Sequence, residues 1–269
     1  MAVSFEFKEK YTISDLLEIM RLLRTPEGCP WDREQTHESI RSNLLEETHE
    51  ALEAIDRGDM PLLQEELGDV LLQVVFHAQM EQEKGSFTFD DVVDGICKKL
   101  VVRHPHVFGG VTADDAGQVL KNWDAIKRET KGGKTQADML RAVPRALPAL
   151  MRAGKVQNRA RRVGFDWPDV SGALQALDSE TAELKQAIAS GDAAAMEEEL
   201  GDLLFSAVNV SRFIDTDAEQ ALTGATDKFI RRFTVVEQLA AERGVDMTSA
   251  SLEQLDRLWE EAKGRPPAE

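Results

Sequence analysis

The sequence predicts an all-α protein, organised as a tandem repeat of two helical bundles. Apolar residues recur at three- and four-residue intervals along almost the whole 269-residue chain, which is the spacing of amphipathic helices. No stretch alternates apolar and polar residues convincingly enough to predict a strand. Two clusters of carboxylates, in residues 44–69 and 177–202, share one spacing, which indicates an internal duplication.

The first three expected helices have clear sequence boundaries. Residues 12–23 place their apolar side chains on one stripe. A second helix covers residues 37–57 and ends at Gly58, since glycine commonly follows the end of a helix. A third covers about residues 59–85 and carries Pro61 in its first turn, where proline is tolerated.

The remaining helices follow the same signals. Thr88 and Asp91 form a capping box that starts a fourth helix, and residues 114–130 form a fifth. Residues 104–110, HPHVFGG, are expected to be a loop insertion. Helical spacing then resumes in five segments, at residues 139–162, 170–190, 193–215, 217–243 and 251–263.

The two halves meet in a polar stretch. Residues 129–138 include Gly132 and Gly133, and they are the best linker candidate in the chain. We therefore expect an N-terminal domain of residues 1–128 and a C-terminal domain of residues 139–269.

The halves match each other in order. Four carboxylates of the first half recur 133 residues later, the tryptophans recur after 136, and the basic stretch 98–103 matches 227–232 after 129. Small insertions account for this drift, so one helical unit has been duplicated. The pairs are Glu47 and Glu180, Glu50 and Glu183, Glu66 and Glu199, Asp69 and Asp202, Trp31 and Trp167, and Trp123 and Trp259.

The repeated carboxylates have the spacing of a cation site. Glu180 and Glu183 are three residues apart and share a helix face, as do Glu199 and Asp202 on the next helix. A short loop makes the two helices antiparallel neighbours, so the four carboxylates can converge. Such a group repels itself unless a hard divalent cation intervenes, which favours Mg²⁺, with Mn²⁺ as a substitute.

Two other interpretations of these acids were weighed. Acids on helices are usually solvated, but here they lie in strongly apolar helices and occur twice, with Gly68 and Gly201 inside the motifs. A di-iron bundle needs a Glu-x-x-His on each of two helices. Glu46 and His49 form one such pair, but their counterparts are Ser179 and Ala182, which argues against iron.

Basic residues offer a complementary set for phosphate. Lys228 and Arg232 share a helix face, and they form either a solvated surface or a pair of cations for phosphate oxygens. Trp259, followed one turn later by Lys263, belongs either to the core or to a site that stacks a base and holds a phosphate. The first-half counterparts of this set are Lys99, Arg103 and Trp123.

Composition limits the possible partners. The net charge of −17 argues against general binding to nucleic acid or an anionic membrane. Cys29 and Cys97 are expected to be reduced thiols in a cytoplasmic protein, and we expect neither a signal peptide nor a membrane span. A Walker A loop, a Rossmann fingerprint and a nucleophile elbow are all absent from the sequence.

Several short motifs accompany the acids between residues 12 and 263. Each half carries a Glu-rich motif followed by ELGD. The motifs are EETHE (46–50), ELGD (66–69), SETAE (179–183), ELGD (199–202), CPWDREQT (29–36), RHPHVF (103–108), LPALMRA (147–153) and VGFDW (163–167).

Together these motifs resemble the two-domain members of the MazG family of all-α nucleoside triphosphate pyrophosphohydrolases, whose motif is EExxE, a spacer and ExxD. The resemblance implies Mg²⁺-dependent hydrolysis of nucleoside triphosphates, ATP among them, to monophosphate and pyrophosphate in nucleotide-pool house-cleaning. It also implies a homodimer in which helices of two subunits complete the bundles. An enzyme with narrower specificity, for dUTP or a modified nucleotide, and a non-catalytic interaction protein remain alternatives.

The resemblance assigns roles mainly in the C-terminal copy, which is the usual catalytic one in such proteins. The metal ligands would be Glu180, Glu183, Glu199 and Asp202, with Glu180 or Glu183 as the catalytic base, and Glu47, Glu50, Glu66 and Asp69 as a second metal set. The substrate-binding residues would be Lys228, Arg232, Trp259, Asn209 and Lys263. Two positions depart from the pattern: Ser179 replaces the first Glu of EExxE, and Ala195 stands where related proteins can carry a Lys.

Overall fold

The computed structural model describes residues 4–110 and 135–265, and every regular element in these ranges is a helix. This confirms the predicted all-α class. The chain divides into two compact units, Met1–Gly132 and Gly133–Glu269. The boundaries expected from sequence, at residues 128 and 139, remain a prediction. No described helix combines the length and the apolar content that a membrane crossing requires.

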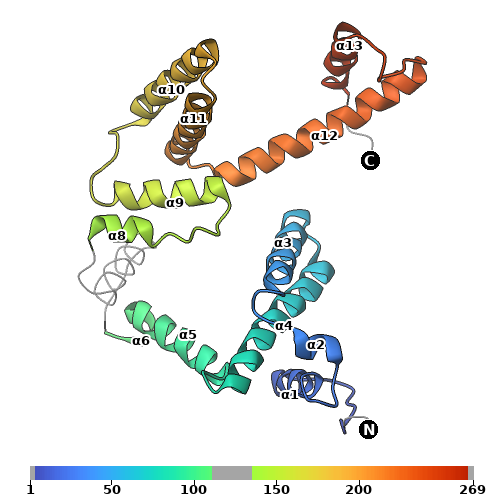
Figure 1. Cartoon of the computed structure of the whole chain (residues 1–269), viewed down its shortest axis with the longest axis vertical. Coiled ribbons are helices and arrows are strands. Elements are labelled where there is room, and N and C mark those ends of the chain that lie inside the picture. The colour runs from blue at the N-terminus through green and yellow to red at the C-terminus, as the bar shows by residue number, and fades with distance from the viewer. Residues whose placement is uncertain (1–3, 111–134, 266–269) are drawn as a thin grey trace. The chain divides into compact units, whose positions relative to one another are not determined.

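The first unit is built on a helical hairpin. α3 and α4 pack side by side, and α1 packs against the later turns of α4 (Figure 1). The described helices of this unit are α1 (Ile13–Leu23), α2 (Pro30–Glu34), α3 (Arg41–Arg57), α4 (Met60–Lys84), α5 (Phe89–Arg103) and α6 (Pro105–Phe108). Its core consists of Met20, Ile40, Val75, Phe76 and Met80.

The second unit repeats the hairpin with α10 and α11, and α9 packs across α11. α12 leads away from this hairpin and carries α13 at its far end (Figure 1). The described helices are α8 (Gln136–Arg141), α9 (Ala149–Arg161), α10 (Val170–Ser190), α11 (Ala193–Phe213), α12 (Ala218–Glu242) and α13 (Leu252–Ala262). α12 and α13 share their own core of Val235, Val236, Leu239, Ala240, Leu258 and Ala262.

The two hairpins turn on the same dipeptide. Gly58 and Gly191 adopt left-handed φ values of +66° and +74°, which glycine reaches without steric penalty. The next residue caps the second helix of each pair: Asp59 accepts a hydrogen bond from the backbone N–H of Leu62, and Asp192 caps α11 in the same way. Because the two turns are alike, the paired helices of both hairpins are aligned in the same register. This register determines which acids of the two helices face each other.

The structure corrects some expected boundaries. The single helix expected over 139–162 is two helices, α8 and α9, because Pro144 and Pro148 interrupt the helical hydrogen bonding. α8 begins at Gln136, within the stretch expected as a linker, since Thr135 and Asp138 form a capping box there. The short helices α2 and α6 were missed, and α6 lies within the expected loop 104–110. The helix expected at 114–130 lies outside the described residues.

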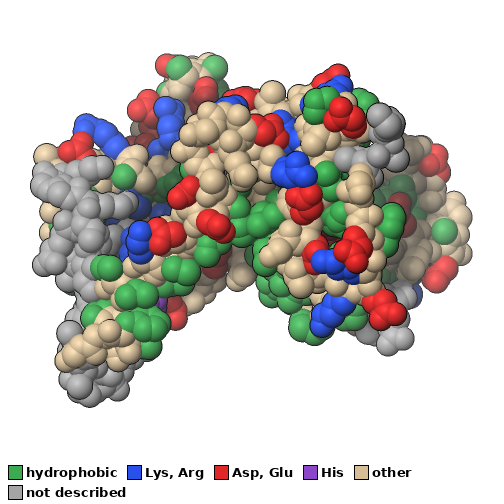
Figure 2. All heavy atoms as spheres, turned by 90° about the horizontal axis from the view of Figure 1, so that it is seen from below, with side chains coloured by type: hydrophobic (Ala, Val, Ile, Leu, Met, Phe, Trp, Pro, Cys, Tyr) green, Lys and Arg blue, Asp and Glu red, His purple; other side chains and the backbone are tan. Residues whose placement is uncertain are grey.

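Two long helices expose apolar faces. No residue of α5 is buried, and in α12 every residue from Gln220 to Arg231 is exposed. Hydrophobic side chains are visible on the molecular surface between the charged ones (Figure 2). Exposed apolar patches of this kind mark interaction surfaces or ligand-binding grooves. On α5 and α12 they include Val92, Val93, Ile96, Leu100, Val101, Val102, Leu222, Phe229, Ile230 and Phe233.

The α12–α13 core offers a test of the fold. We expect Leu239→Ala to destabilise this helix pair by about 2–5 kcal/mol, because Leu239 is fully buried and its loss leaves a cavity. Hydrogen exchange of the α12 and α13 amides measures the local loss. Leu252→Ala is the matched control, since Leu252 is 81% exposed. Equal effects of the two substitutions would contradict this packing.

Candidate metal centre

Three carboxylates of the second unit form a compact group. One oxygen each from Glu180 on α10 and from Glu199 and Asp202 on α11 lies within 4.8 Å of the others. The hairpin explains this convergence. Glu180 precedes the turn at Gly191 by 11 residues and Asp202 follows Asp192 by 10, so the acids lie level, about 15 Å from the turn on both helices.

The carboxylates of this group repel one another. Burial raises the pKa of Glu180, and the charges of Glu183 and Asp202 raise it further. The pKa of Glu199 is raised by burial and then by Glu183 and Glu180. Glu183 therefore belongs electrostatically to the group, as its spacing predicts. Both shifts have the direction expected where negative charges gather without a counter-charge between them.

Ser179, which departs from the family pattern, changes the contacts of a neighbouring acid. Its hydroxyl donates a hydrogen bond of 2.9 Å to Oε1 of Glu183. The first unit has the exposed Glu46 at the matching position. The second unit thus has one negative charge fewer beside its acid group, and it has a donor that holds one oxygen of Glu183.

The first unit carries a matching group. Oxygens of Glu47, Glu66 and Asp69 lie within 4.8 Å of one another, and Glu66 is only 8% exposed. Burial raises the pKa of Glu47 and of Glu66, and the charge of Glu50 adds to both shifts. Both repeats therefore retain the geometry that the sequence predicts for a cation site.

The chemistry of the donors fits a hard divalent cation. In both groups the converging ligand atoms are carboxylate oxygens, without histidine or cysteine among them. Oxygen-only sites suit Mg²⁺ or Mn²⁺ better than zinc. Gly68 and Gly201 have open space around them: a Cβ on either one would meet nothing within 4 Å in the described chain. The chain's own packing therefore does not explain why these positions are glycine.

The predicted basic and aromatic residues form a second cluster. The guanidinium carbon of Arg232 on α12 lies 6.0 Å from the ring centre of Trp259 on α13, and the Phe229 ring lies 5.1 Å from the same ring. Lys228 is exposed. Nζ of Lys263 makes a 2.5 Å ion pair with Glu260. The aromatic contact supports a stacking surface with cations beside it.

The acids and the bases stand on different helix pairs. Within residues 135–265, α13 packs extensively only against α12, at the end that points away from the α10–α11 hairpin (Figure 1). The single chain thus does not bring Arg232 and Trp259 to the carboxylates. In the first unit, Lys99 is exposed on α5, Arg103 is half-buried, and Trp123 lies outside the described residues.

Asn209 belongs to a buried polar network that sequence reasoning only partly found. Asn209 is 7% exposed, and its Oδ1 accepts a 2.5 Å hydrogen bond from Nη2 of Arg212. Arg212 also binds both carboxylate oxygens of Asp166, at 2.5 and 2.8 Å, and so lowers the pKa of Asp166. Asp166 lies in the VGFDW motif, which was the available signal, but its pairing with Arg212 was not predicted.

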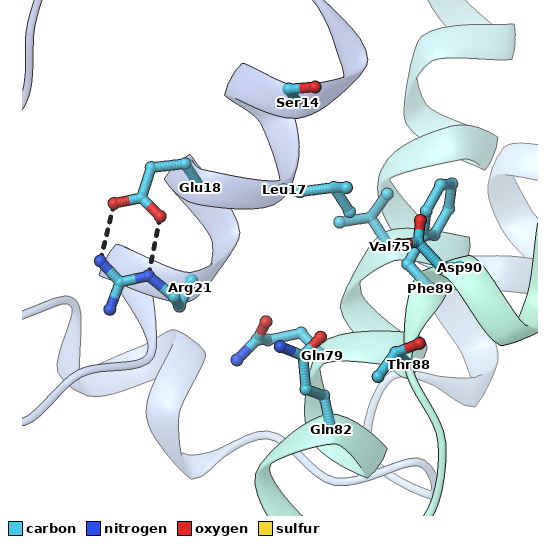
Figure 3. Close-up of a pocket in the computed structure, with 10 residues that line it drawn as sticks. All are labelled: Ser14, Leu17, Glu18, Arg21, Val75, Gln79, Gln82, Thr88, Phe89 and Asp90. Carbon is cyan, nitrogen blue, oxygen red and sulfur yellow. Dashed lines mark hydrogen bonds and ion pairs between the residues drawn. The ribbon is translucent and has the colours of Figure 1, made fainter.

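A cavity of the first unit is lined by none of the acids of either group. It occupies about 330 Å³ between α1, the later turns of α4 and the start of α5 (Figure 3). Leu17, Val75 and Phe89 line it together with Gln79 and Gln82. A bidentate ion pair between Glu18 and Arg21 borders it. This mixed, weakly charged lining lacks the carboxylate cluster that a cation requires.

Comparison with known proteins identifies the family. The model of the MazG nucleotide pyrophosphohydrolase domain matches residues 35–108 and again residues 170–236. The chain belongs to the MazG family. Each match contains one complete acid group, so the family domain and the carboxylate site occur together in both halves of this MazG chain.

Named relatives cover nearly the whole length. A Thermotoga maritima protein named nucleoside triphosphate pyrophosphohydrolase/pyrophosphatase MazG is 47% identical over 93% of this chain and 95% of its own length. An Escherichia coli K12 nucleoside triphosphate pyrophosphohydrolase is 48% identical over 93% of this chain and 97% of its own length. The uncharacterized protein YabN of Bacillus subtilis is 46% identical, with the match covering 94% of this chain but 52% of YabN.

The metal centre can be tested through the mutual repulsion of its carboxylates. The raised pKa values of Glu180 and Glu199 mean that their ionisation opposes folding, so stability without metal should rise as pH falls through those pKa values. Asp202→Asn removes one repelling charge. We expect it to slow hydrogen exchange of α10 and α11 in EDTA, and to abolish the protection that Mg²⁺ or Mn²⁺ gives these helices.

The control for this experiment is Glu197→Gln, an exposed position on α11 outside the acid group. It should retain the metal-dependent protection. The first unit provides an internal reference, because α3 and α4 keep their own acids in both variants. Full metal protection of α10 and α11 in Asp202→Asn would show that this carboxylate is not a ligand.

Proposed function

We propose that this chain hydrolyses nucleoside triphosphates to the monophosphate and pyrophosphate, with Mg²⁺ as the cofactor and Mn²⁺ as a substitute. The observation that carries the proposal is the group of Glu180, Glu199 and Asp202, with Glu183 beside it, inside a MazG domain. Family relatives named as nucleoside triphosphate pyrophosphohydrolases match nearly the whole chain. A triphosphate is a polyanion, so it can approach these acids only with a cation between them.

The acids would hold the cation and receive a proton. A divalent cation held by Glu180, Glu199 and Asp202 would supply positive charge that offsets the carboxylates and would act as a Lewis acid toward the phosphate and the attacking water. Glu180 or Glu183 accepts a proton from the attacking water. The water oxygen bonds to the α-phosphorus while the bond from that phosphorus to the bridging oxygen breaks, and pyrophosphate leaves with the bond electrons. Lys228 and Arg232 would stabilise the charge on the leaving pyrophosphate.

We further propose that a second copy of the chain completes the site. The acids on α10 and α11 and the bases on α12 and α13 lie on separate helix pairs of one chain. α12 exposes an apolar face that includes Phe229 and Ile230, beside Lys228 and Arg232. A homodimer that buries this face against the α10–α11 hairpin of the partner would bring bases to acids, and it would remove apolar surface from water.

The acids of the two repeats can be neutralised separately. We expect Glu180→Gln and Asp202→Asn each to reduce pyrophosphate release from ATP by at least about a hundredfold, because the metal loses a ligand. The matched first-unit variants, Glu47→Gln and Asp69→Asn, should retain most activity if the C-terminal copy is catalytic. Circular dichroism verifies the helical fold in all four. Normal turnover in the second-unit variants would refute this assignment.

Complementation tests whether two chains share a site. A chain with Glu180→Gln and a chain with Arg232→Gln should each be inactive. When they are co-expressed, half the dimers are mixed, and each mixed dimer has one site with intact acids and intact bases. We therefore expect about a quarter of the wild-type activity. If acids and bases act within one chain, the mixture stays as inactive as either variant alone.

A further inference from the structure

Asn209 has a position from which it can reach a bound nucleotide. It follows Asp202 by seven residues on α11, which is two helical turns on the same face and about 10 Å along the axis. It is 7% exposed, so its amide is nearly removed from solvent. A buried amide on the face of the acid group requires hydrogen-bond partners.

The oxygen of the Asn209 side-chain amide already has a hydrogen-bond partner. The guanidinium of Arg212 is only a donor, so the Asn209 atom that faces it at 2.5 Å must be the oxygen. Arg212 is itself held by a bidentate pair with Asp166, and both side chains are mostly buried. Within residues 4–110 and 135–265, no hydrogen bond from Nδ2 of Asn209 is found, and this nitrogen is not among the fully buried atoms without a partner, so it can still be reached from solvent. The network therefore fixes the amide in one orientation and leaves its nitrogen as a donor.

The first repeat lacks this arrangement although it keeps the acids. At the interval of 133 that relates the acids, Asn209 corresponds to Phe76 and Arg212 to Gln79. At the interval of 136 that relates the tryptophans, Asp166 corresponds to Pro30. Phe76 is 4% exposed and belongs to the apolar core of its unit. The same turn of the repeated helix serves apolar packing in one unit and carries a mostly buried asparagine with an oriented amide in the other.

We propose that Asp166 and Arg212 are positioning residues that hold the amide nitrogen of Asn209 toward an oxygen of the nucleoside part of the substrate. This inference rests on the proposed function. The two-turn separation from Asp202 places the donor beyond the phosphates held at the acids, where the sugar or base lies. The first unit has Phe76 at the matching position, so it lacks this donor for a nucleoside.

Asn209→Asp tests the donor. The substitution keeps an oxygen for Arg212, replaces the amide nitrogen by a second acceptor oxygen and adds a negative charge. We expect the KM for ATP to rise about tenfold or more, because a buried hydrogen bond is lost, while kcat changes less than about threefold. The inhibition constant of inorganic tripolyphosphate, which has no nucleoside, should change much less than KM. Equal increases of both values would place the contact at the phosphates and overturn the proposal.

Asp166 is tested by its dependence on Asn209. Asp166→Asn removes the bidentate partner of Arg212, so the Asn209 amide can rotate, and KM should rise with kcat nearly unchanged. Asp166→Glu, which can still bind both guanidinium nitrogens, should restore KM to within about threefold. Adding Asp166→Asn to Asn209→Asp should raise KM no further, because both act through one contact. Additive effects would show that Asp166 has a separate role.

Control experiments distinguish a failure of this positioning inference from a failure of the proposed function. Glu253→Gln breaks an exposed ion pair with Arg257 and should leave KM unchanged. Mn²⁺ binding without nucleotide should be equal in wild type and Asn209→Asp, since the amide is not a metal ligand. If the wild-type chain releases no pyrophosphate from any triphosphate, the proposed function fails. If the wild type is active and Asn209→Asp has a normal KM, only the positioning inference fails.

Discussion

The register of the helical hairpin is the constraint on which the rest of this structure depends. In each unit a Gly-Asp turn, at Gly58 and at Gly191, sets the two helices antiparallel and level. The acids then meet, although like charges at this distance oppose the packing and raise one another's pKa. The two helices of each hairpin nevertheless pack against each other extensively, α3 with α4 and α10 with α11. A fold that accepts this repulsion twice has a favourable use for it, and binding of a cation is the direct one.

After the duplication, both units kept the hairpin and the acids, but the later turns of the second helix diverged. In α4 these turns serve internal structure: Nδ1 of His77 lies 2.7 Å from Nδ1 of His37, and His37 also contacts Glu81. Burial, followed by the effect of His37, lowers the pKa of His77, which favours the neutral form of His77. In α11 the same region holds Asn209 and Arg212. Both repeats therefore share the convergent acid group, whereas the later turns of the second helix differ.

The sequence predicted the parts of this molecule that depend on near neighbours. Glycine, proline and capping residues located most helix ends, and the three-residue spacing of Glu180 and Glu183 predicted a shared face of one helix, α10, although of these two only Glu180 is among the three acids that converge. Contacts between distant residues were harder. Asp166 and Arg212 are 46 positions apart, and neither has a spacing that reveals the other. The break between α8 and α9 followed from two prolines but was obscured by helical spacing on both sides. The separation of acids from bases was invisible, because a linear pattern does not say where α12 points.

That separation has a physical consequence for how such a site could work. If one chain held carboxylates and cations together, they would pair with each other, and a buried pair resists opening for a ligand. Arg232 instead rests near the Trp259 ring, and Lys228 is exposed. If the basic residues reach the acids only from a second chain, as proposed, the acids stay available for a metal and the bases for phosphate until all components meet. Assembly would then also exclude water from the reacting phosphate, which strengthens each of these electrostatic contacts.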